Sequence, residues 1–595
     1  MQTVNGLLAF LILWHGANGF SSTGAHRHVS AGASRRLRNN SPSPLRVTSP
    51  KTEEELREKL ARNNEDLSEV DSKVLENFGG LEDAQFLAEI KKERPYFAVL
   101  AEKASETVDS ILKTSKSDRP DSSPPTGVPK PRVVVLGTGW AAHALLKEID
   151  ASKFEVTTVS PRNFFLFTPM LAASAVGTVE YRSITEPIRK VNPEANYLEA
   201  TCTGIDVAQK TITCQNVVCE GTTCTIEDFE LPYDYLVVSV GATTNTFNTP
   251  GVMEHCIFLK QVQDAQKLRK AIGNCFERAN LPTVTEEQRI AALTFAIVGA
   301  GPTGVECCAE LRDFIEEVGR RCWCLKAAIS SLTERSTKLI DEGFIETEMT
   351  EVLLKVGVKA VTGTQLELSD GSNIPYGLAV WAAGNGPLPL VLDLIQEVEE
   401  QKEKAAWGRG RLVTDDWLRL LGAPSVFALG DCAVINDKPL PQTAQVASQQ
   451  GTYLARLFSR GFEFSATVPQ KNTDNEGVEA AAGGSAASSD GSDTPLGEDG
   501  GEKVPLSEKL GLSIVKGKFA KPFQFLNLGI LAYTGAGGAL AQVQVGKESV
   551  KSTGATGYLL WRSIYLSKQV SWRNRFLVGT DWIKTKIFGR DITRL

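Results

Sequence analysis

Two glycine-rich turns contain the residues whose spacing points most directly to chemistry. Each follows an apolar run, VVVL in one case and TFAIV in the other, and each opens an apolar-patterned helix. In such a turn the first glycine permits a tight bend, the second lets the backbone approach a pyrophosphate, and the third position allows close helix–strand packing. The residues are Gly137, Thr138, Gly139 and Ala142 in the first turn, and Gly299, Gly301, Thr303 and Gly304 in the second. Two such turns predict two dinucleotides, with electrons passing between them.

The residue that would bind each ribose differs between the two turns. After the first turn, FEVTTVSPRN places Ser160 where an acid is usual, so we expect a hydroxyl and Arg162 to serve there. After the second, Glu334 follows the strand-like AAISSL, and its carboxylate would accept from a 2′-hydroxyl and repel a 2′-phosphate. Glu334 therefore favours NADH, while the neighbouring Arg335 keeps NADPH as an alternative.

A third element completes the first nucleotide site. SVFALGDCA is another strand, and it ends in Gly430-Asp431 at a helix start, where a carboxylate can accept from the hydroxyls of a ribityl chain. Because Asp431 lies so far along the chain from Gly137, the first domain must be split and the second inserted into it. Residues 233–246 and 378–386 are the expected crossings between the domains. Candidate cofactor contacts in these crossings are Gly241, Gly384 and Asn385.

The expected architecture is α/β, with two Rossmann-like dinucleotide-binding domains and a C-terminal amphipathic helical membrane-anchoring region. The FAD domain is split by the inserted NAD domain. The predicted segments are a targeting presequence (1–51), a helical extension (52–116), a linker (117–131), the first half of the FAD-binding domain (132–250), an NAD(P)H-binding domain (251–384), the second half of the FAD-binding domain (385–464), a low-complexity insert (465–518) and a C-terminal membrane-association region (519–595).

Charge and cysteine usage exclude several other classes of function. A net charge of −7 over 595 residues gives no sign of nucleic-acid binding. The 11 cysteines are irregularly spaced, with no Cys-x-x-Cys pair, so we predict no metal site and mostly reduced thiols. The first glycine-turn helix contains no cysteine, which disfavours a disulfide reductase, and a sulfide:quinone oxidoreductase would likewise need suitably placed reactive cysteines.

The two ends of the chain suggest an organelle and a membrane. LLAFLILW (7–14) is too short to span a bilayer and resembles a signal-peptide core, and an acid-free stretch with Ser, His and Arg follows it. This order favours a plastid of secondary origin, with a mitochondrial presequence as the alternative. From residue 557 onwards the chain carries eight Lys/Arg, two Asp and Trp561, Trp572 and Trp582. Such a composition suits amphipathic helices lying on an anionic membrane surface.

Several long motifs in order resemble the type II NADH:quinone oxidoreductases, in their plant and fungal branch. They include SPRNFFLFTPML, PGVMEHCIFLKQVQDAQKLR, FAIVGAGPTGVE, ALGDCA, AQVASQQGTYLA and LLWRSIYLSKQVSWRNRFLVGTDWIKTKIFGRDI. The resemblance covers residues 132–595 apart from the 465–518 insert. It implies a membrane-associated flavoenzyme that oxidises NADH and reduces a quinone by two-electron transfer through tightly bound FAD, without proton pumping. It also implies a homodimer as one oligomeric state.

The resemblance also assigns residues to roles. It implies that FAD is held by Gly137, Gly139, Ala142, Asp431, Thr168 and Pro169, and NADH by Gly299, Gly301, Gly304, Glu334 and the 384–386 turn. Glu306 would lie where the two cofactors meet, and Gln445 and Gln449, with Ala444 and Ala447, would form the quinone site. The alternatives are a non-catalytic flavoprotein that docks on a membrane or complex, and a related flavin reductase that uses NADPH.

Overall fold

The computed structural model describes residues 94–114, 129–220, 223–321, 356–462, 515–516, 519–545 and 548–591. They divide into two compact units, of which the smaller comprises the described residues up to 114 and from 515 to 522. In this unit the helix α5 (Tyr96–Thr114) carries Glu102, whose buried carboxylate bonds Arg94 and lies 3.7 Å from Lys521 Nζ. Arg94 also donates to the carbonyl of Pro522 at 3.0 Å. These ionic contacts attach α5 to the segment that follows the short strands β22 (Val515–Lys516) and β23 (Phe519–Ala520).

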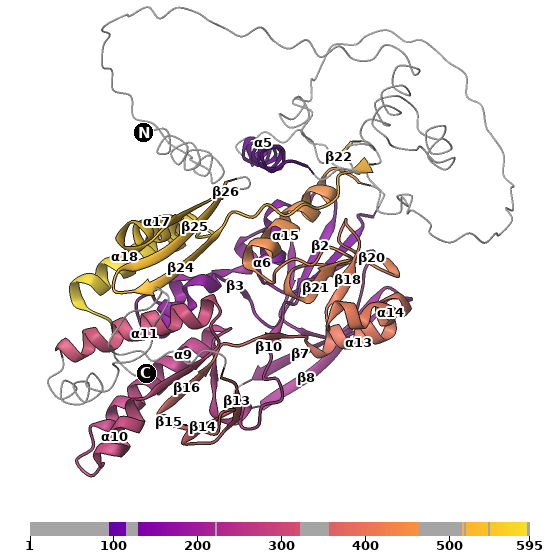
Figure 1. The fold of residues 1–595 in the computed structure, drawn as a ribbon. Coiled ribbons are helices and arrows are strands. Elements are labelled where there is room, and N and C mark those ends of the chain that lie inside the picture. Colours follow the sequence, from indigo (N-terminus) through magenta and orange to yellow (C-terminus); the bar gives the residue numbers. More distant parts are fainter. Residues whose placement is uncertain are drawn as a thin grey trace, which may run out of the picture. The chain divides into compact units, whose positions relative to one another are not determined.

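The larger unit is built on an eight-stranded sheet in the order β21-β18-β19-β20-β9-β1-β2-β5 (Figure 1). The strands from β20 to β5 run parallel, and β19 runs antiparallel to both of its neighbours. Val133 to Leu136 are all buried, as expected for a parallel strand covered on both faces. The bounds are β1 (Arg132–Leu136), β2 (Glu155–Val159), β5 (Asn196–Leu198), β9 (Tyr235–Val238), β18 (Leu412–Thr414), β19 (Arg419–Leu420), β20 (Ala423–Ala428) and β21 (Ala433–Ile435).

A smaller parallel sheet is inserted between two strands of the main sheet. β9 and β20 are hydrogen-bonded neighbours, with Leu236 opposite Val426, although much of the chain lies between them. The chain leaves through β10 (Thr243–Thr244) and returns through β17 (Asn385–Gly386), and these two strands pair antiparallel. The fold class predicted from the two glycine turns is therefore confirmed. The inserted elements include β11 (Ile257–Phe258), α9 (Val262–Ala279), α10 (Glu286–Leu293), β12 (Phe295–Val298), α11 (Pro302–Arg321), β13 (Val358–Val361), β14 (Gln365–Leu368), β15 (Asn373–Pro375) and β16 (Leu378–Trp381).

Two helices cross closely beside the main sheet. These are α6 (Trp140–Glu148), which follows the first glycine turn, and α15 (Ala444–Ser459). A Cβ placed on Gly451 would lie only 2.1 Å from the backbone oxygen of Ala141, so this crossing requires glycine. The distance also explains why the helix interior tolerates a residue that usually destabilises a helix.

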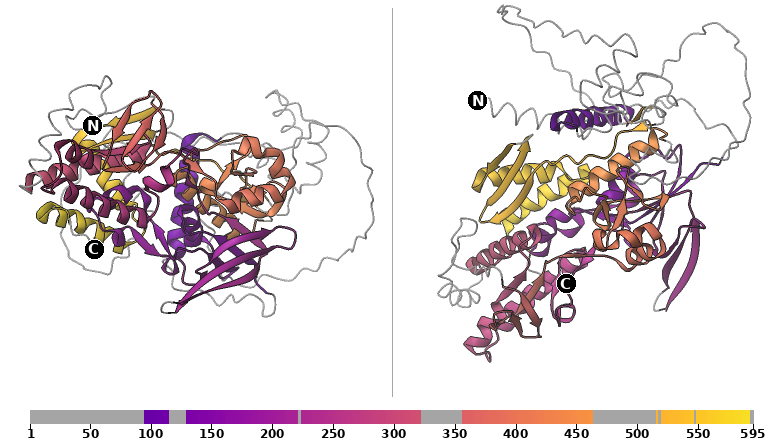
Figure 2. Two further views of the ribbon diagram at one scale, coloured as in Figure 1. Left: turned by 90° about the horizontal axis from the view of Figure 1, so that it is seen from below. Right: turned by 45° about the vertical axis from the view of Figure 1, so that its right-hand side comes forward.

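A separate antiparallel sheet projects from the edge of the larger unit, where Figure 2 shows it as long magenta-purple strands. It consists of β6 (Thr201–Asp206), β7 (Thr211–Glu220) and β8 (Thr223–Pro232). The helix α13 (Pro389–Glu397) packs against β6. The buried side chains Ile212 and Cys214 of β7 belong to the same apolar cluster as Leu394 of α13.

The C-terminal region combines a three-stranded sheet with two helices, drawn in yellow in Figure 1. Its elements are β24 (Ile530–Gly535), β25 (Gly538–Val545), β26 (Glu548–Ser552), α17 (Gly554–Ser567) and α18 (Trp572–Phe588). Trp561 is buried, with its ring 5.5 Å from that of Tyr533 and 4.8 Å from that of Tyr565. The grouping of Trp561 with membrane-facing aromatics was therefore wrong, because this indole fills the core between α17 and β24.

Arg590, which follows α18, ties the C-terminal region to the inserted domain. Its guanidinium lies 3.3 Å from the Glu310 carboxylate and 3.2 Å from that of Glu317, both on α11. It also donates to the hydroxyl of Thr178 at 3.0 Å. Arg590 and Glu310 are nearly buried, so these charges compensate each other away from solvent.

Candidate active site

One cavity of about 1330 Å³ joins the two glycine turns. Its walls come from the ends of β1, β2 and β9 and from the first residues of α6, α11 and α15. Most of the residues predicted from the sequence line it: Gly137, Thr138, Gly139, Ser160, Arg162, Thr168, Gly241, Gly301, Thr303, Glu306, Gly384, Asn385, Gly430 and Asp431.

Three predicted residues shape the turns from outside this cavity. Gly299 has φ +115°, and a Cβ there would lie 2.8 Å from the backbone of Ala382. A Cβ on Gly304 would lie 1.9 Å from the oxygen of Gly299, which leaves no room for a side chain. Ala142, at the corresponding position of the first turn, is fully buried in α6. These positions allow close packing of helix on strand, the role that the third motif position predicts.

Gln445 and Gln449 lie near the cavity but do not line it. The Gln449 amide exchanges two hydrogen bonds with the backbone of Leu526, at 2.9 and 3.0 Å, and Gln445 Oε1 accepts from Leu528 N at 3.0 Å. Both glutamines therefore hold the 526–528 segment against the start of α15. Glu334, predicted to select the nucleotide, lies outside the described residues.

Three helix N-termini open on the cavity. Gly139 and Trp140 begin α6, Gly301 and Pro302 begin α11, and Thr443 caps α15 by accepting from Val446 N at 3.3 Å. The first N–H groups of a helix have no partner within it, and the helix dipole adds partial positive charge there. The cavity is therefore suited to anionic groups such as pyrophosphates.

The cavity wall that follows β2 provides polar groups where a ribose-binding acidic residue is usual. The Ser160 hydroxyl lies 3.3 Å from that of Thr138 and accepts from Arg162 N at 3.2 Å. Arg162 donates to Gln261 Oε1 at 2.6 Å, while its buried Nε has no hydrogen-bond partner within the described ranges. A buried guanidinium N–H without an acceptor fits a ligand that supplies one. Burial lowers the pKa of Arg162, which nevertheless stays charged.

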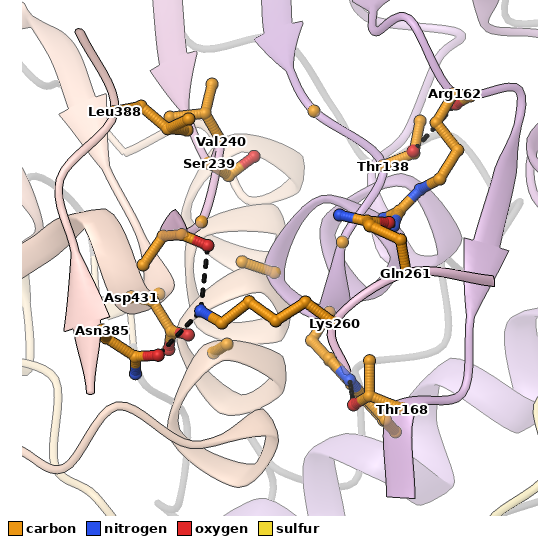
Figure 3. A pocket seen from close by; sticks show the side chains of 18 of the residues that line it. Thr138, Arg162, Thr168, Ser239, Val240, Lys260, Gln261, Asn385, Leu388 and Asp431 are labelled. Atoms are coloured by element: carbon orange, nitrogen blue, oxygen red, sulfur yellow. Dashed lines mark hydrogen bonds between the residues drawn. The ribbon is translucent and has the colours of Figure 1, made fainter. Parts of the chain in front are cut away.

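Lys260, which the sequence analysis did not single out, reaches into the cavity (Figure 3). Its ammonium donates to the carbonyls of Ala242 and Thr243 at 3.1 and 3.0 Å and to Asn385 Oδ1 at 2.7 Å. Burial lowers the pKa of Lys260, and the charge of Asp431 opposes that change. Lys260 thus connects both domain crossings to the carboxylate that follows β20.

Asp431 is itself held in a polar network. Burial raises the pKa of Asp431, whereas Lys260 and Arg411 lower it. Gln442 donates to the carbonyl of Asp431 at 2.6 Å, and Asn385 donates to Gln442 at 3.4 Å. These contacts hold the main chain at Asp431, whose carboxylate the sequence predicts at a ribityl chain.

Glu306 lines the same cavity from the first turns of α11. Burial raises the pKa of Glu306 to about 8, a hydrogen bond from Tyr533 N at 3.4 Å opposes the rise, and Glu310 adds to it. The side chains of Trp561 and Tyr565 of α17 lie beside it. At neutral pH this carboxyl is therefore mostly protonated, next to the cavity.

Three further residues shape the cavity without a signal in the sequence pattern. Trp140 donates from its indole to the Thr168 hydroxyl at 3.0 Å and packs edge-on against Phe165. Tyr565 and Leu531 close the wall beside Glu306. Aromatic and apolar groups around a few fixed polar atoms are typical of a cofactor site.

The residues present fit FAD and a nicotinamide nucleotide. A Cβ on Gly139 would meet no atom within 4 Å, so space remains where backbone must approach a pyrophosphate, whereas one on Gly137 would lie 2.6 Å from Ser239 O. The unsatisfied Arg162 Nε, the anchored Asp431 and the helix N-termini supply donors and acceptors for a dinucleotide. The second turn contributes its own helix N-terminus, at Gly301, to the same cavity.

Comparisons with known proteins agree with this geometry. Residues 131–451 match the pyridine nucleotide-disulphide oxidoreductase family, and residues 527–591 match the NDH2 C-terminal domain. The chain is 32% identical to a mitochondrial external alternative NAD(P)H-ubiquinone oxidoreductase B1 of Solanum tuberosum, over 83% of this chain and 94% of the relative. It is 37% identical to a probable mitochondrial NADH-ubiquinone oxidoreductase of Schizosaccharomyces pombe, over 80% and 86%.

A solved structure shows the same fold. NDH2 from Plasmodium falciparum in complex with NADH has a TM-score of 0.61 and 25% identity, covering 78% of this chain and all of that one. With both nucleotide turns, the shared cavity and the matched C-terminal domain, the chain belongs to the pyridine nucleotide-disulphide oxidoreductases and, among them, to the type II NADH:quinone oxidoreductases.

Proposed function

We propose that this chain oxidises NADH and reduces a quinone by two-electron transfer through bound FAD, without proton pumping. The observation that carries the proposal is the single cavity onto which α6 and α11 both open, because two nucleotides bound there would meet. The names of the plant and fungal relatives, which are NAD(P)H- or NADH-ubiquinone oxidoreductases, support the same reaction. When bound, FAD accepts a hydride equivalent and passes on two electrons.

The cofactor roles follow the two ends of the cavity. Gly137, Gly139 and Arg162 would hold the pyrophosphate and ribose of FAD, and Asp431 the ribityl chain. Gly301 and Thr303 would hold the nucleotide NADH, with the 384–386 turn near its nicotinamide. Thr168, fixed by the Trp140 indole, would border the flavin ring.

Glu306 would supply the proton that the reaction consumes. Converting NADH and a quinone into NAD⁺ and a quinol takes up one proton from solution. Glu306 lines the cavity, and its raised pKa of about 8 keeps it protonated at neutral pH. Gln445 retains an amide NH₂ group that makes no hydrogen bond to any described residue, and this group would face a quinone carbonyl. Gln449, with both amide atoms bonded to Leu526, would act by positioning the loop.

A membrane-docking face on α18 would give access to a lipid-dissolved quinone. Trp572, Phe576, Ile583 and Ile587 are exposed and recur on one stripe of the helix. Lys584 and Lys586 are exposed beside them, which suits anionic lipid. Among the described residues no helix has the length and apolar content needed to cross a bilayer. Flotation with anionic vesicles tests this face: Phe576→Ser together with Ile583→Ser should abolish binding, and unchanged binding would refute it.

The cellular location and the oligomeric state are proposed from the relatives and from the family resemblance. The relatives carry mitochondrial names, which support an organelle and the mitochondrial alternative and give no support to a plastid. The targeting segment lies outside the described residues, so imaging of a C-terminal fluorescent fusion decides between the two organelles. A homodimer is proposed from the family resemblance, and light scattering of the detergent-solubilised protein tests it.

The decisive experiment is anaerobic stopped-flow absorbance near 450 nm with the FAD-loaded protein. Bleaching by NADH followed by recovery with a soluble quinone is the expected result. Bleaching by NADPH alone would overturn the preference assigned to Glu334 and favour the NADPH-dependent reductase. A bound flavin that neither nucleotide reduces would refute the enzyme and favour the docking flavoprotein.

A further inference from the structure

A pair of cysteines lies face to face in the antiparallel sheet beside the cavity. In the register of β6 and β7, Cys202 stands directly opposite Cys214. Residues directly opposite on antiparallel strands have Cα atoms about 4.5–5.5 Å apart, within the range that a disulfide spans. Cys202 and Cys214 contribute to the same apolar cluster, Cys214 as a buried member and Cys202 packed against it. Both are free in this structure.

The surroundings give the two sulfurs different access. Cys214 is fully buried in the apolar cluster beneath α13, whereas Cys202 is partly exposed and belongs to the wall of the cavity. The strand pairing is irregular between Cys202 and Gly204, and the Cys202 thiol donates to the Gly204 carbonyl at 3.3 Å.

We propose that Cys202 and Cys214 form a thiol–disulfide couple that reacts with a low-molecular-weight disulfide such as glutathione disulfide. The Cys202 thiolate attacks one sulfur of the reagent, which releases one thiol and leaves a mixed disulfide on Cys202. Cys214 then attacks the Cys202 sulfur and releases the second thiol. Overall, two protein thiols and one small disulfide become one protein disulfide and two small thiols, so electrons and protons balance.

Access sets this order of events, because Cys202 lines the cavity and Cys214 is buried. The neighbouring Cys214 and burial raise the pKa of the Cys202 thiol, and the neighbouring Cys202 lowers the pKa of Cys214. Entry of the reagent at Cys202 should therefore accelerate as pH rises, because only the thiolate attacks.

The link would act on the cofactor cavity through β6. Thr201, Cys202 and Thr203 line the cavity, and the bond would fix this wall to β7, whose residues Ile212 and Cys214 are buried in the core. We therefore expect the oxidised protein to release FAD several-fold more slowly than the reduced protein. This proposal does not depend on turnover with NADH or quinone.

Peptide mapping by mass spectrometry tests the assignment on the full-length, FAD-loaded protein treated with glutathione disulfide. We expect a Cys202–Cys214 linked peptide that dithiothreitol removes, and a persistent glutathione adduct on Cys202 in the Cys214→Ser variant. Cys219 also stands opposite Cys224, on β7 and β8, so the Cys219→Ser, Cys224→Ser double variant is the matched control and should still form the link.

Three results would overturn the proposal. The first is wild-type protein in which glutathione stays on Cys202, and the second is a link found only after denaturation. The third is a rate of FAD release, followed by flavin fluorescence, that is the same in the oxidised and reduced proteins.

Discussion

Replacing Glu306 by glutamine should change how stability depends on pH, and the direction follows from burial. In the folded chain the pKa of Glu306 is about 8, whereas in the unfolded chain a glutamate titrates near its ordinary value of about 4.3. Between these values the folded state holds a proton that the unfolded state has lost. Wild-type stability therefore falls as pH rises through this window and is level above it.

The size of the effect follows from the width of the window. Each pH unit is worth about 1.4 kcal/mol, so the full window amounts to on the order of 5 kcal/mol. Glutamine does not ionise and can still accept from Tyr533 N. The Glu306→Gln variant should exceed the wild type by only about 1 kcal/mol near pH 5 and by several kcal/mol at pH 9.

Urea unfolding at pH 5, 7 and 9 measures this difference. Glu287→Gln, at an exposed position of α10, is the control and should follow the wild type at every pH. A difference between Glu306→Gln and the wild type that stays constant from pH 5 to 9 would mean that Glu306 titrates normally. The proposal that a protonated Glu306 supplies the proton for quinone reduction would then be refuted.

Three further substitutions test the packing around the site. Lys260→Met removes three hydrogen bonds from a charged donor, each worth about 1.5–3 kcal/mol. FAD should therefore dissociate faster from this variant, as measured by flavin fluorescence. The control Lys267→Met, on the exposed side of α9, should not change the rate of FAD dissociation. Arg590→Met leaves Glu310 buried without its counter-charge and should cost about 3–5 kcal/mol in urea unfolding, some of which the added Glu310→Gln change should restore. Gly451→Ala forces α15 away from α6 and should lower the melting temperature and the FAD content together; a variant with normal values for both would refute the close crossing.

The features of the site that depend on local geometry could be predicted from the sequence. A strand, a glycine turn and a helix are contiguous, so Gly137, Gly139 and Gly301 could be placed at cofactor-facing helix starts from their spacing alone. Asp431 could be placed for the same reason, because GD follows an apolar strand at a helix start.

The remainder depends on contacts between distant segments. Lys260 is one of many lysines, and its role is visible only when the fold brings Ala242, Asn385 and Asp431 to its ammonium. Gln449 was assigned to quinone from its motif, but its amide is bonded to Leu526, which the sequence gives no means of placing. Trp561 lies in a segment whose composition is typical of a membrane anchor. In the structure, however, its ring packs against Tyr533 and Tyr565 and belongs to the hydrophobic core.

The pairing of β10 with β17 has a consequence for how the chain folds. Thr243 and Thr244 stand opposite Gly386 and Asn385, so the inserted domain begins and ends at one place. The parallel pairing of β9 with β20 would otherwise have to close a very long loop, which slows folding. If the inserted domain folds first, its two ends lie side by side. They then bring β20, which begins the second half of the main sheet, next to β9. The order of synthesis and the order of assembly then differ. The strands β1 to β9 are synthesised first, but their sheet is completed only after the inserted domain, which is synthesised later, has folded.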